Sequence, residues 1–493
     1  MTTVQHAAAD EAAAVAAAPK AILVDGAWRD AAGGGTFPVE DPSTGEELCR
    51  VADGGAAEPG AALDAAAAAQ GAWGATPPRE RARILRAAYE LVQGRAEQLA
   101  VLLTLEMGKP LQESRDEVAY ASEYLLWFAE EAIRIDGRYA VAPDGRGRVL
   151  VMQQPVGPCL IITPWNFPLV MATRATAPAI AAGCTMVVKP SRLAPLATLS
   201  FAGALAEAGL PPGVLNVVPG GRSDAITGVL LGDPRLRKLT FTGSTRVGQE
   251  LLRGSADQIL RVSLELGGNA PFIVFDDADV DEAVRGAIGA KIRNCGEACT
   301  SANRFYVQRG VAEAFTRRLV AAMEGIVVGR GTDPGVTLGP LIDAASQLRL
   351  GELVGDAVAR GATVETGGAA VDGPGFFFAP TVLSGVDRDA RMVREEIFGP
   401  VAPVMTFDDE DEVVAQANDT HLGLAAYVYT QDFHRTLRVV EGLQTGMVGL
   451  NQGRVSNPMA PFGGVKHSGL GRAGGPEAIA EYLETKYVAI RHE

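Results

Sequence analysis

The sequence predicts an α/β protein with two domains, the first of them built on a doubly wound parallel sheet. The chain has 493 residues, which is too long for one compact core. From about residue 157 to 276, short strand-like runs alternate with helical stretches, and a second alternating region runs from about 266 to 455. Alternation of this kind is typical of parallel sheets covered by helices.

Residues 77–135 precede these regions and are predicted to be helical. The pair Pro77-Pro78 is a helix start signal, because proline is tolerated in the first turn. The apolar residues that follow repeat at the 3.6-residue period of a helix, namely Ile84, Leu85, Ala88, Leu91 and Val92.

The first alternating region supplies the strands of the doubly wound sheet. Strand-like runs occur at 159–162, 186–188, 215–218, 238–241 and 271–275, and helical stretches such as 169–182 and 197–208 separate most of them. A nucleotide binds at the carboxyl ends of such strands. No G-x-G-x-x-G follows the first strand, but Gly243-Ser244-Thr245 opens a helix that begins near Arg246. The free N–H groups at that helix start can hold a pyrophosphate.

The second alternating region predicts a separate α/β domain. Its strand candidates include residues 305–307 and 402–407, with a helix at 311–323 between them. Two further strand-like segments, 147–154 and 487–491, lie outside both regions.

The charge balance disfavours some classes of partner. The formal net charge is −15 and the pI is about 5.0, which disfavours nucleic acid and anionic membranes. An anionic substrate would need local arginines to overcome this field. No apolar run approaches the roughly 20 residues of a membrane span. Residues 1–18 are alanine-rich, do not resemble a secretory signal and are expected to form a disordered tail.

The cysteines indicate a reducing compartment. They are odd in number and mostly far apart, and no zinc-type ligand cluster accompanies them, so we expect a cytoplasmic protein without a metal site. The five are Cys49, Cys159, Cys184, Cys295 and Cys299.

Two glycine-flanked segments contain candidate catalytic groups. Glu-Leu-Gly-Gly at 265–268 supplies the carboxylate of Glu265, and Asn-Cys-Gly-Glu-Ala-Cys at 294–299 supplies the thiol of Cys299. A thiol can attack a carbonyl carbon, and a carboxylate can then activate the water that releases the acyl group.

Five more blocks stand in order along the chain. They are Thr-Pro-Trp-Asn-Phe-Pro at 163–168, Lys-Pro-Ser at 189–191, Phe-Thr-Gly-Ser at 241–244, Glu-Glu-Ile-Phe-Gly-Pro at 395–400 and Pro-Phe-Gly-Gly at 461–464. From about residue 20 to the C-terminus, the chain thereby resembles the aldehyde dehydrogenase superfamily. The run at 296–304 is similar to bacterial members of its succinate-semialdehyde dehydrogenase group.

The resemblance implies the aldehyde dehydrogenase fold. A Rossmann-like NAD(P)-binding domain would span residues 19–138 and 156–264, and a catalytic domain residues 265–465. Residues 139–155 and 466–493 would form a small β oligomerisation flap, which implies a homodimer or a homotetramer.

The resemblance also assigns the catalytic residues. Cys299 would be the nucleophile, and the Asn166 amide with the Cys299 backbone N–H would hold the oxyanion. Glu265 would activate the water that hydrolyses the thioester, and its presence argues against transfer of the acyl group to coenzyme A.

The cofactor residues follow from the same resemblance. Lys189 would hold the adenosine ribose, Ser244 would meet the pyrophosphate, Glu396 would hold the nicotinamide ribose, and Phe398 would pack beside the nicotinamide. The other implied cofactor-binding residues are Thr163, Pro164, Trp165, Ser191 and Gly243. Many NAD-preferring members carry a glutamate three residues after this lysine. Arg192 stands there instead and could pair with the 2′-phosphate of NADP.

Two arginines point to the substrate class. Arg174 and Arg293, together with Ser456, match residues that hold the distal carboxylate in succinate-semialdehyde dehydrogenases. The predicted reaction is NAD(P)-dependent oxidation of succinate semialdehyde to succinate. Glutarate semialdehyde, another ω-carboxylated aldehyde or a general aldehyde remain alternative substrates. A non-catalytic binding protein is disfavoured, because Cys299, Glu265 and Asn166 are all present.

Overall fold

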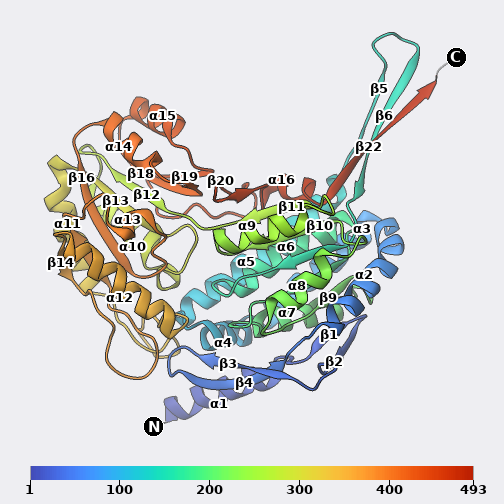
Figure 1. Cartoon of the computed structure of the whole chain (residues 1–493), viewed down its shortest axis with the longest axis horizontal. Coiled ribbons are helices and arrows are strands. Elements are labelled where there is room, and N and C mark those ends of the chain that lie inside the picture. Colours follow the sequence, from blue (N-terminus) through green and yellow to red (C-terminus); the bar gives the residue numbers. More distant parts are fainter. Residues whose placement is uncertain (1, 492–493) are drawn as a thin grey trace.

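The computed structural model of the chain describes residues 2–491. Two large sheets, each covered by helices, form the body, and a three-stranded ribbon that carries the C-terminus projects away from it (Figure 1). Among the described residues, no helix is both long enough and apolar enough to cross a bilayer.

The first sheet has the strand order β2-β1-β9-β8-β7-β10-β11-β21. Its central strands β9, β8, β7, β10 and β11 are parallel, and the strand order reverses between β7 and β10. This is the predicted doubly wound arrangement, in which the reversal opens a crevice for a ligand. The strands are β1 (Ile22–Val24), β2 (Ala27–Arg29), β7 (Cys159–Ile162), β8 (Met186–Lys189), β9 (Leu215–Val217), β10 (Lys238–Thr242), β11 (Arg261–Glu265) and β21 (Gly469–Leu470).

Helices cover both faces of this sheet. Leu160 and Ile162 pack into the cluster on the side of α2, α8 and α9, whereas Ile161 packs into the cluster on the side of α3, α5, α6 and α7. This alternation is the two-residue period of a strand buried on both faces. The helices are α2 (Ala57–Ala75), α3 (Pro78–Gly94), α4 (Ala96–Met107), α5 (Leu111–Glu131), η1 (Ala132–Arg134), α6 (Pro168–Ala182), α7 (Leu196–Glu207), α8 (Ser223–Leu231) and α9 (Thr245–Ser255).

The prediction of a disordered tail over residues 1–18 is wrong for residues 2–17. They form helix α1 (Thr2–Ala17), in keeping with the high helix propensity of alanine. Ala14 is buried with Val101 and Leu105 of α4, so an apolar contact holds the helix to the body.

The second sheet has the order β14-β15-β16-β13-β12-β18-β19, and all its pairs except β14–β15 are parallel. The predicted strand run at 271–275 becomes β12 and belongs here rather than to the first sheet. The strands are β12 (Ala270–Val274), β13 (Ala302–Gln308), β14 (Thr363–Thr366), β15 (Thr381–Ser384), β16 (Val401–Phe407), β18 (Ala425–Tyr429) and β19 (Met447–Leu450). The helices are α10 (Val280–Lys291), η2 (Arg293–Gly296), α11 (Arg309–Glu324), α12 (Ala344–Ala359), α13 (Arg391–Arg394), α14 (Glu410–Asn418) and α15 (Phe433–Gly442).

The projecting ribbon joins β5 (Arg138–Val141), β6 (Gly147–Pro155) and β22 (Leu483–Arg491). Strands β6 and β22 pair antiparallel along their whole length, so the two outlying segments seen in the sequence lie side by side. The ribbon exposes several large apolar side chains, namely Tyr139, Val141, Met152, Tyr487 and Ile490. The remaining elements are β3 (Thr36–Asp41), β4 (Glu46–Ala52), β17 (Leu422–Gly423), β20 (Val465–Lys466) and α16 (Gly475–Ala480).

Candidate active site

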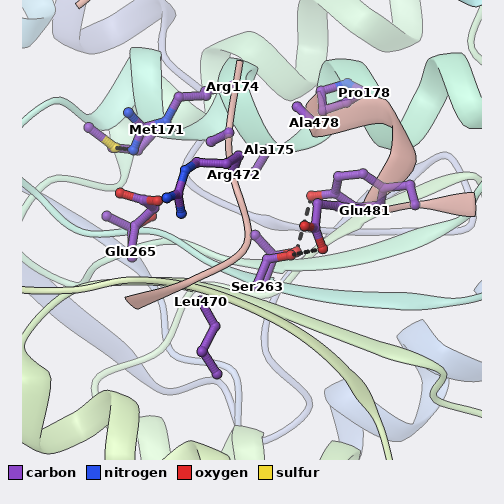
Figure 2. A pocket seen from close by; sticks show the side chains of 14 residues that line it. Met171, Arg174, Ala175, Pro178, Ser263, Glu265, Leu470, Arg472, Ala478 and Glu481 are labelled. Atoms are coloured by element: carbon purple, nitrogen blue, oxygen red, sulfur yellow. Dashed lines mark hydrogen bonds between the residues drawn. The ribbon is translucent and has the colours of Figure 1, made fainter. Parts of the chain in front are cut away.

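Glu265 is the last residue of β11, at the carboxyl edge of the first sheet. Its side chain is buried, and neither carboxylate oxygen has a hydrogen-bond partner among the described residues. It borders a cavity of about 30 Å³, and Figure 2 shows the Arg472 guanidinium beside the carboxylate. Burial raises the pKa of Glu265 to about 8, against the opposing charges of Arg174 and Arg472. A carboxylate with this pKa is suited to act as a base near neutral pH.

The backbone around Glu265 leaves room only for glycine. A Cβ on Gly463 would lie 2.7 Å from Oε1 of Glu265. The Pro-Phe-Gly-Gly block therefore approaches the carboxylate closely, which explains why a side chain is excluded there.

Cys299 lies in the loop between η2 and β13. Just before it, Asn294 and Cys295 have left-handed φ angles of 56° and 58°, which are strained for residues other than glycine. A Cβ on Gly268 would lie 2.2 Å from the carbonyl oxygen of Cys299, so this glycine lets the Glu-Leu-Gly-Gly segment pass directly beside the nucleophile loop.

The surroundings of Cys299 favour the protonated form of its thiol. Burial raises its pKa to about 12, although the positive charges of Arg174 and Arg293 oppose the shift. The negative charges of Glu265 and Glu396 add to it. The thiol must therefore lose its proton as it attacks the carbonyl carbon.

Asn166 is held firmly in the turn before α6. Its Nδ2 donates to the carbonyl oxygen of Glu297 at 3.0 Å, which leaves the second N–H of the amide for another acceptor. The Asn166 carbonyl oxygen accepts from Nζ of Lys109 at 2.8 Å and from Nδ2 of Asn294 at 3.0 Å. Lys109 is itself paired with Glu117. Lys109 and Glu117 lie outside the motif blocks, and Asn294 opens the block at 294–299. The sequence did not indicate the role of any of the three in holding Asn166.

A cavity of about 350 Å³ joins most of the predicted residues at the crevice of the first sheet. The predicted residues that line it are Pro164, Trp165, Asn166, Gly243, Ser244, Glu265, Cys299, Glu396 and Phe398. The lining residues that sequence reasoning missed are Met171, Thr242, Leu266, Gly267 and Arg349.

The nicotinamide end of this cavity is built around Glu396. Its Oε1 accepts from the backbone N–H of Gly268 at 3.0 Å, and a Cβ on Gly267 would lie 2.9 Å from its Oε2. Burial raises the pKa of Glu396 to about 7. Phe398 packs edge-on against Trp165, with ring centroids 5.5 Å apart. Two aromatic walls and a carboxylate fit a nicotinamide and its ribose.

The pyrophosphate end lies at the start of α9. Ser244 is the N-cap residue, and its Oγ accepts from the N–H of Val247 at 3.5 Å. A helix N-terminus with a glycine before it fits a pyrophosphate, because its first N–H groups have no partner within the helix. The residues present therefore fit a dinucleotide.

The remaining predicted cofactor residues lie outside the lining of this cavity, at and after the carboxyl ends of β7 and β8. Lys189 is buried and its Nζ donates to the carbonyl oxygen of Pro190 at 3.1 Å. Burial lowers the pKa of Lys189 to about 8, and the charge of Arg192 adds to this effect. The Arg192 side chain is exposed and forms no ion pair with any residue from 2 to 491. The Ser191 Oγ accepts from Leu193 N.

Thr163, directly after β7, connects this strand to Lys189 at the end of β8. Its backbone N–H donates to the carbonyl oxygen of Lys189 at 3.1 Å, which fixes the two strand ends together. Its hydroxyl is buried, and within the described part of the chain it has no hydrogen-bond partner.

Arg174 and Arg293 approach Cys299 from different elements. Arg174, on α6, is buried with its guanidinium carbon 4.2 Å from the Phe462 ring centroid. Arg293, in η2, lies 5.1 Å from the ring centroid of Phe167. Neither guanidinium forms an ion pair with a described carboxylate, although both charges act on Cys299.

Asn166 precedes α6, which begins at Pro168 and carries Arg174. Ser456 is half-buried in the loop after β19 and does not line the cavity at Cys299.

Known proteins share this fold and sequence. The aldehyde dehydrogenase family profile matches residues 28–488. A succinate-semialdehyde dehydrogenase of Paenarthrobacter nicotinovorans is 58% identical over 87% of this chain and 96% of its own. A glutarate-semialdehyde dehydrogenase of Pseudomonas aeruginosa is 49% identical over 95% of this chain and 96% of its own. The crystal structure of an E. coli NADP-dependent enzyme is 48% identical and superposes with a TM-score of 0.95 over 96% of this chain and 98% of that one. The chain therefore belongs to the aldehyde dehydrogenase family.

Proposed function

We propose that the protein oxidises succinate semialdehyde to succinate with NADP or NAD. The observation that carries this proposal is the pair of guanidinium groups, Arg174 and Arg293, that act on Cys299 and form no ion pair among the described residues. Guanidinium groups of this kind beside a nucleophile favour a substrate with a distal acid group, because that group can form charge-assisted hydrogen bonds with them.

The chain's own residues divide the reaction into two stages. Cys299 loses its proton to solvent as its sulfur bonds to the aldehyde carbon, and the free N–H of Asn166 stabilises the resulting oxyanion. A bound nicotinamide would accept the hydride from that carbon. Glu265 then takes a proton from water, whose oxygen attacks the thioester carbon and breaks its bond to Cys299. The net change is aldehyde, water and oxidised cofactor to acid, reduced cofactor and protons.

The cofactor choice rests on Arg192. A glutamate there would repel the 2′-phosphate of NADP, whereas an exposed arginine beside Lys189 attracts it. We therefore propose that NADP is used well and that strict NAD dependence ranks second.

Arg192→Glu is expected to shift the ratio of kcat/KM for NADP to that for NAD by about ten- to a hundredfold toward NAD, because one charge-assisted contact is replaced by repulsion. Steady-state kinetics with both cofactors measure the ratio. Arg79→Glu is the matched control, since Arg79 is exposed on α3 and its reversal changes the net charge equally. If Arg192→Glu leaves the ratio of kcat/KM for NADP to that for NAD unchanged, Arg192 does not bind the 2′-phosphate.

Arg174→Ala or Arg293→Ala is expected to raise KM for succinate semialdehyde about ten- to a hundredfold, because a charge-assisted contact is lost. The KM for butanal, an uncharged aldehyde of the same length, should change little. Initial rates with both substrates give the comparison. Equal losses on both would assign the arginines a structural role.

Glutarate semialdehyde is the second candidate substrate. It carries the same two functional groups one carbon further apart, and a relative that is 49% identical is a glutarate-semialdehyde dehydrogenase. Initial rates with C2 to C6 aldehydes, with and without a terminal carboxylate, separate the two. A higher kcat/KM for the C5 acid than for the C4 acid would favour glutarate semialdehyde.

We propose that the protein works as a homodimer or homotetramer in the cytoplasm. The exposed apolar residues on the ribbon of β5, β6 and β22 support association, because an isolated three-stranded sheet with apolar faces gains stability when it is covered. The five cysteines are all unpaired, which supports a reducing compartment. Light scattering after size-exclusion chromatography measures the assembly, and a monomer would contradict it.

A further inference from the structure

A third guanidinium, that of Arg454, lies close enough to the predicted substrate arginine Arg293 for their charges to interact. Arg454 stands in the loop between β19 and β20, and its guanidinium carbon is 6.0 Å from the ring centroid of Tyr120 on α5. Its side chain is exposed and forms no ion pair within residues 2–491. The mechanism derived above does not use it.

Two tyrosines connect Arg454 to the interior. The hydroxyl oxygens of Tyr120 and Tyr124 are 2.7 Å apart, and Arg174 lies close enough to Tyr124 for its charge to act on that hydroxyl. Tyr124 is fully buried and Arg174 nearly so. The contacts therefore run from an exposed arginine, through a half-buried and a buried tyrosine, to a buried arginine that acts on Cys299.

Arg293 is close enough to influence Arg454. Although much of the Arg454 side chain is exposed, partial burial lowers its pKa, and the charge of Arg293 lowers it further. The nearby acids Asp116 and Glu113 act on it more weakly, and Glu113 already accepts from the backbone N–H of Asn294 at 2.6 Å. Glu113 also interacts with Arg293. Each acid acts on Arg454 more weakly than Arg293 does, so the two guanidinium groups leave a local positive field.

This field has the opposite sign to the protein as a whole. The formal net charge of −15 repels an anionic aldehyde from most of the surface. The three arginines differ in exposure: Arg454 is exposed, Arg293 is half-buried and Arg174 is buried. Arg174 and Arg293 both act on Cys299, and Arg293 acts on Arg454, so the positive charge near the nucleophile extends to an exposed side chain.

We propose that Arg454 is a specificity-determining residue that draws the acid group of the substrate to the mouth of the active site, before Arg293 and Arg174 bind it. This inference rests on the proposed function, since it assumes an aldehyde with a distal negative charge. Arg454 acts on substrate capture and hence on kcat/KM, because an exposed charge speeds association without touching the reacting atoms.

The test is Arg454→Gln, assayed with succinate semialdehyde and with butanal at low and at high ionic strength. At about 10 mM salt, kcat/KM for succinate semialdehyde should fall about three- to tenfold with kcat unchanged, whereas butanal should be unaffected. At about 500 mM salt, screening should remove most of the difference from the wild type.

Two further variants make the result decisive. Arg454→Lys keeps the charge but not the planar group, so it should retain most of the rate, which a purely structural role of the guanidinium would not allow. Arg79→Gln removes the same charge from an exposed site on α3 that does not line the cavity at Cys299, and it should have no substrate-dependent effect. Equal losses on both aldehydes, a loss that persists at high salt or no loss at all would each overturn the proposal.

The outcome also separates this inference from the proposed function. If Arg174→Ala and Arg293→Ala discriminate against succinate semialdehyde but Arg454→Gln does not, only the role of Arg454 fails. If none of the three variants distinguishes the charged from the uncharged aldehyde, the proposed substrate class fails as well.

Discussion

Cys299→Ala is expected to lower aldehyde oxidation by about four orders of magnitude or more, because no other group in the site can form the covalent bond to the substrate carbon. Its neighbour Cys295 is buried in a core cluster and does not line the cavity. Cofactor binding should stay nearly intact, since the residues that fit the dinucleotide come from other segments. Formation of reduced cofactor measures the first effect, and calorimetric titration with NADP measures the second.

Cys49→Ala is the matched control for loss of a thiol. Cys49 is a half-buried cysteine of β4 and does not line the cavity at Cys299, so this variant should keep full activity. Appreciable turnover by purified Cys299→Ala would rule out Cys299 as the nucleophile.

Glu265→Gln is expected to separate the two stages of the reaction. Steady-state turnover should fall by about 10²- to 10⁴-fold, because the thioester loses the base that activates water. One burst of reduced cofactor per site should survive. The negative charge of Glu265 contributes to the raised pKa of Cys299, so its removal makes the thiol easier to ionise. Rapid mixing with succinate semialdehyde measures burst and steady state together.

The pH dependence gives a second signature of Glu265. Since the base acts when it is deprotonated and its pKa is about 8, the steady-state rate of the wild type should rise as pH increases through 8. This rise of the rate with pH, the limb of the pH profile near pH 8, should be absent from Glu265→Gln. A burst that is also lost would mean that Glu265 is needed before hydrolysis, and an unchanged pH limb would assign the titration to another group.

The local elements of the fold could be predicted from sequence, because apolar periodicity and turn signals act over a few residues. The runs at 159–162 and 186–188 became neighbouring parallel strands, and Ser244 capped a helix as the Gly-Ser-Thr signal indicated. It was harder to predict to which of the two sheets a strand belongs. Strand β12 is buried on both faces, and a strand of that kind looks the same in either sheet. Helix α1 was missed because alanine-rich composition alone does not reveal the apolar contact that holds it.

The residues of the candidate site were likewise predictable in part: those within sequence motifs could be found, and those outside motifs could not. Residues within motifs, such as Glu265, Cys299 and Glu396, line one cavity. Arg349 and Arg472 were missed because each comes from a segment with no signal of its own, and only the three-dimensional fold brings it to the cavity. Their charges nevertheless tune Glu396 and Glu265, respectively.

The proposed substrate of this site is an aldehyde with a distal acid group. The most direct test is kcat/KM of the wild-type protein for succinate semialdehyde and for butanal, each measured with NADP. We predict a value at least about tenfold higher for succinate semialdehyde, since one charge-assisted contact at a buried arginine contributes that much. Equal kcat/KM values for the two aldehydes, or a higher value for butanal, would contradict this proposed substrate class.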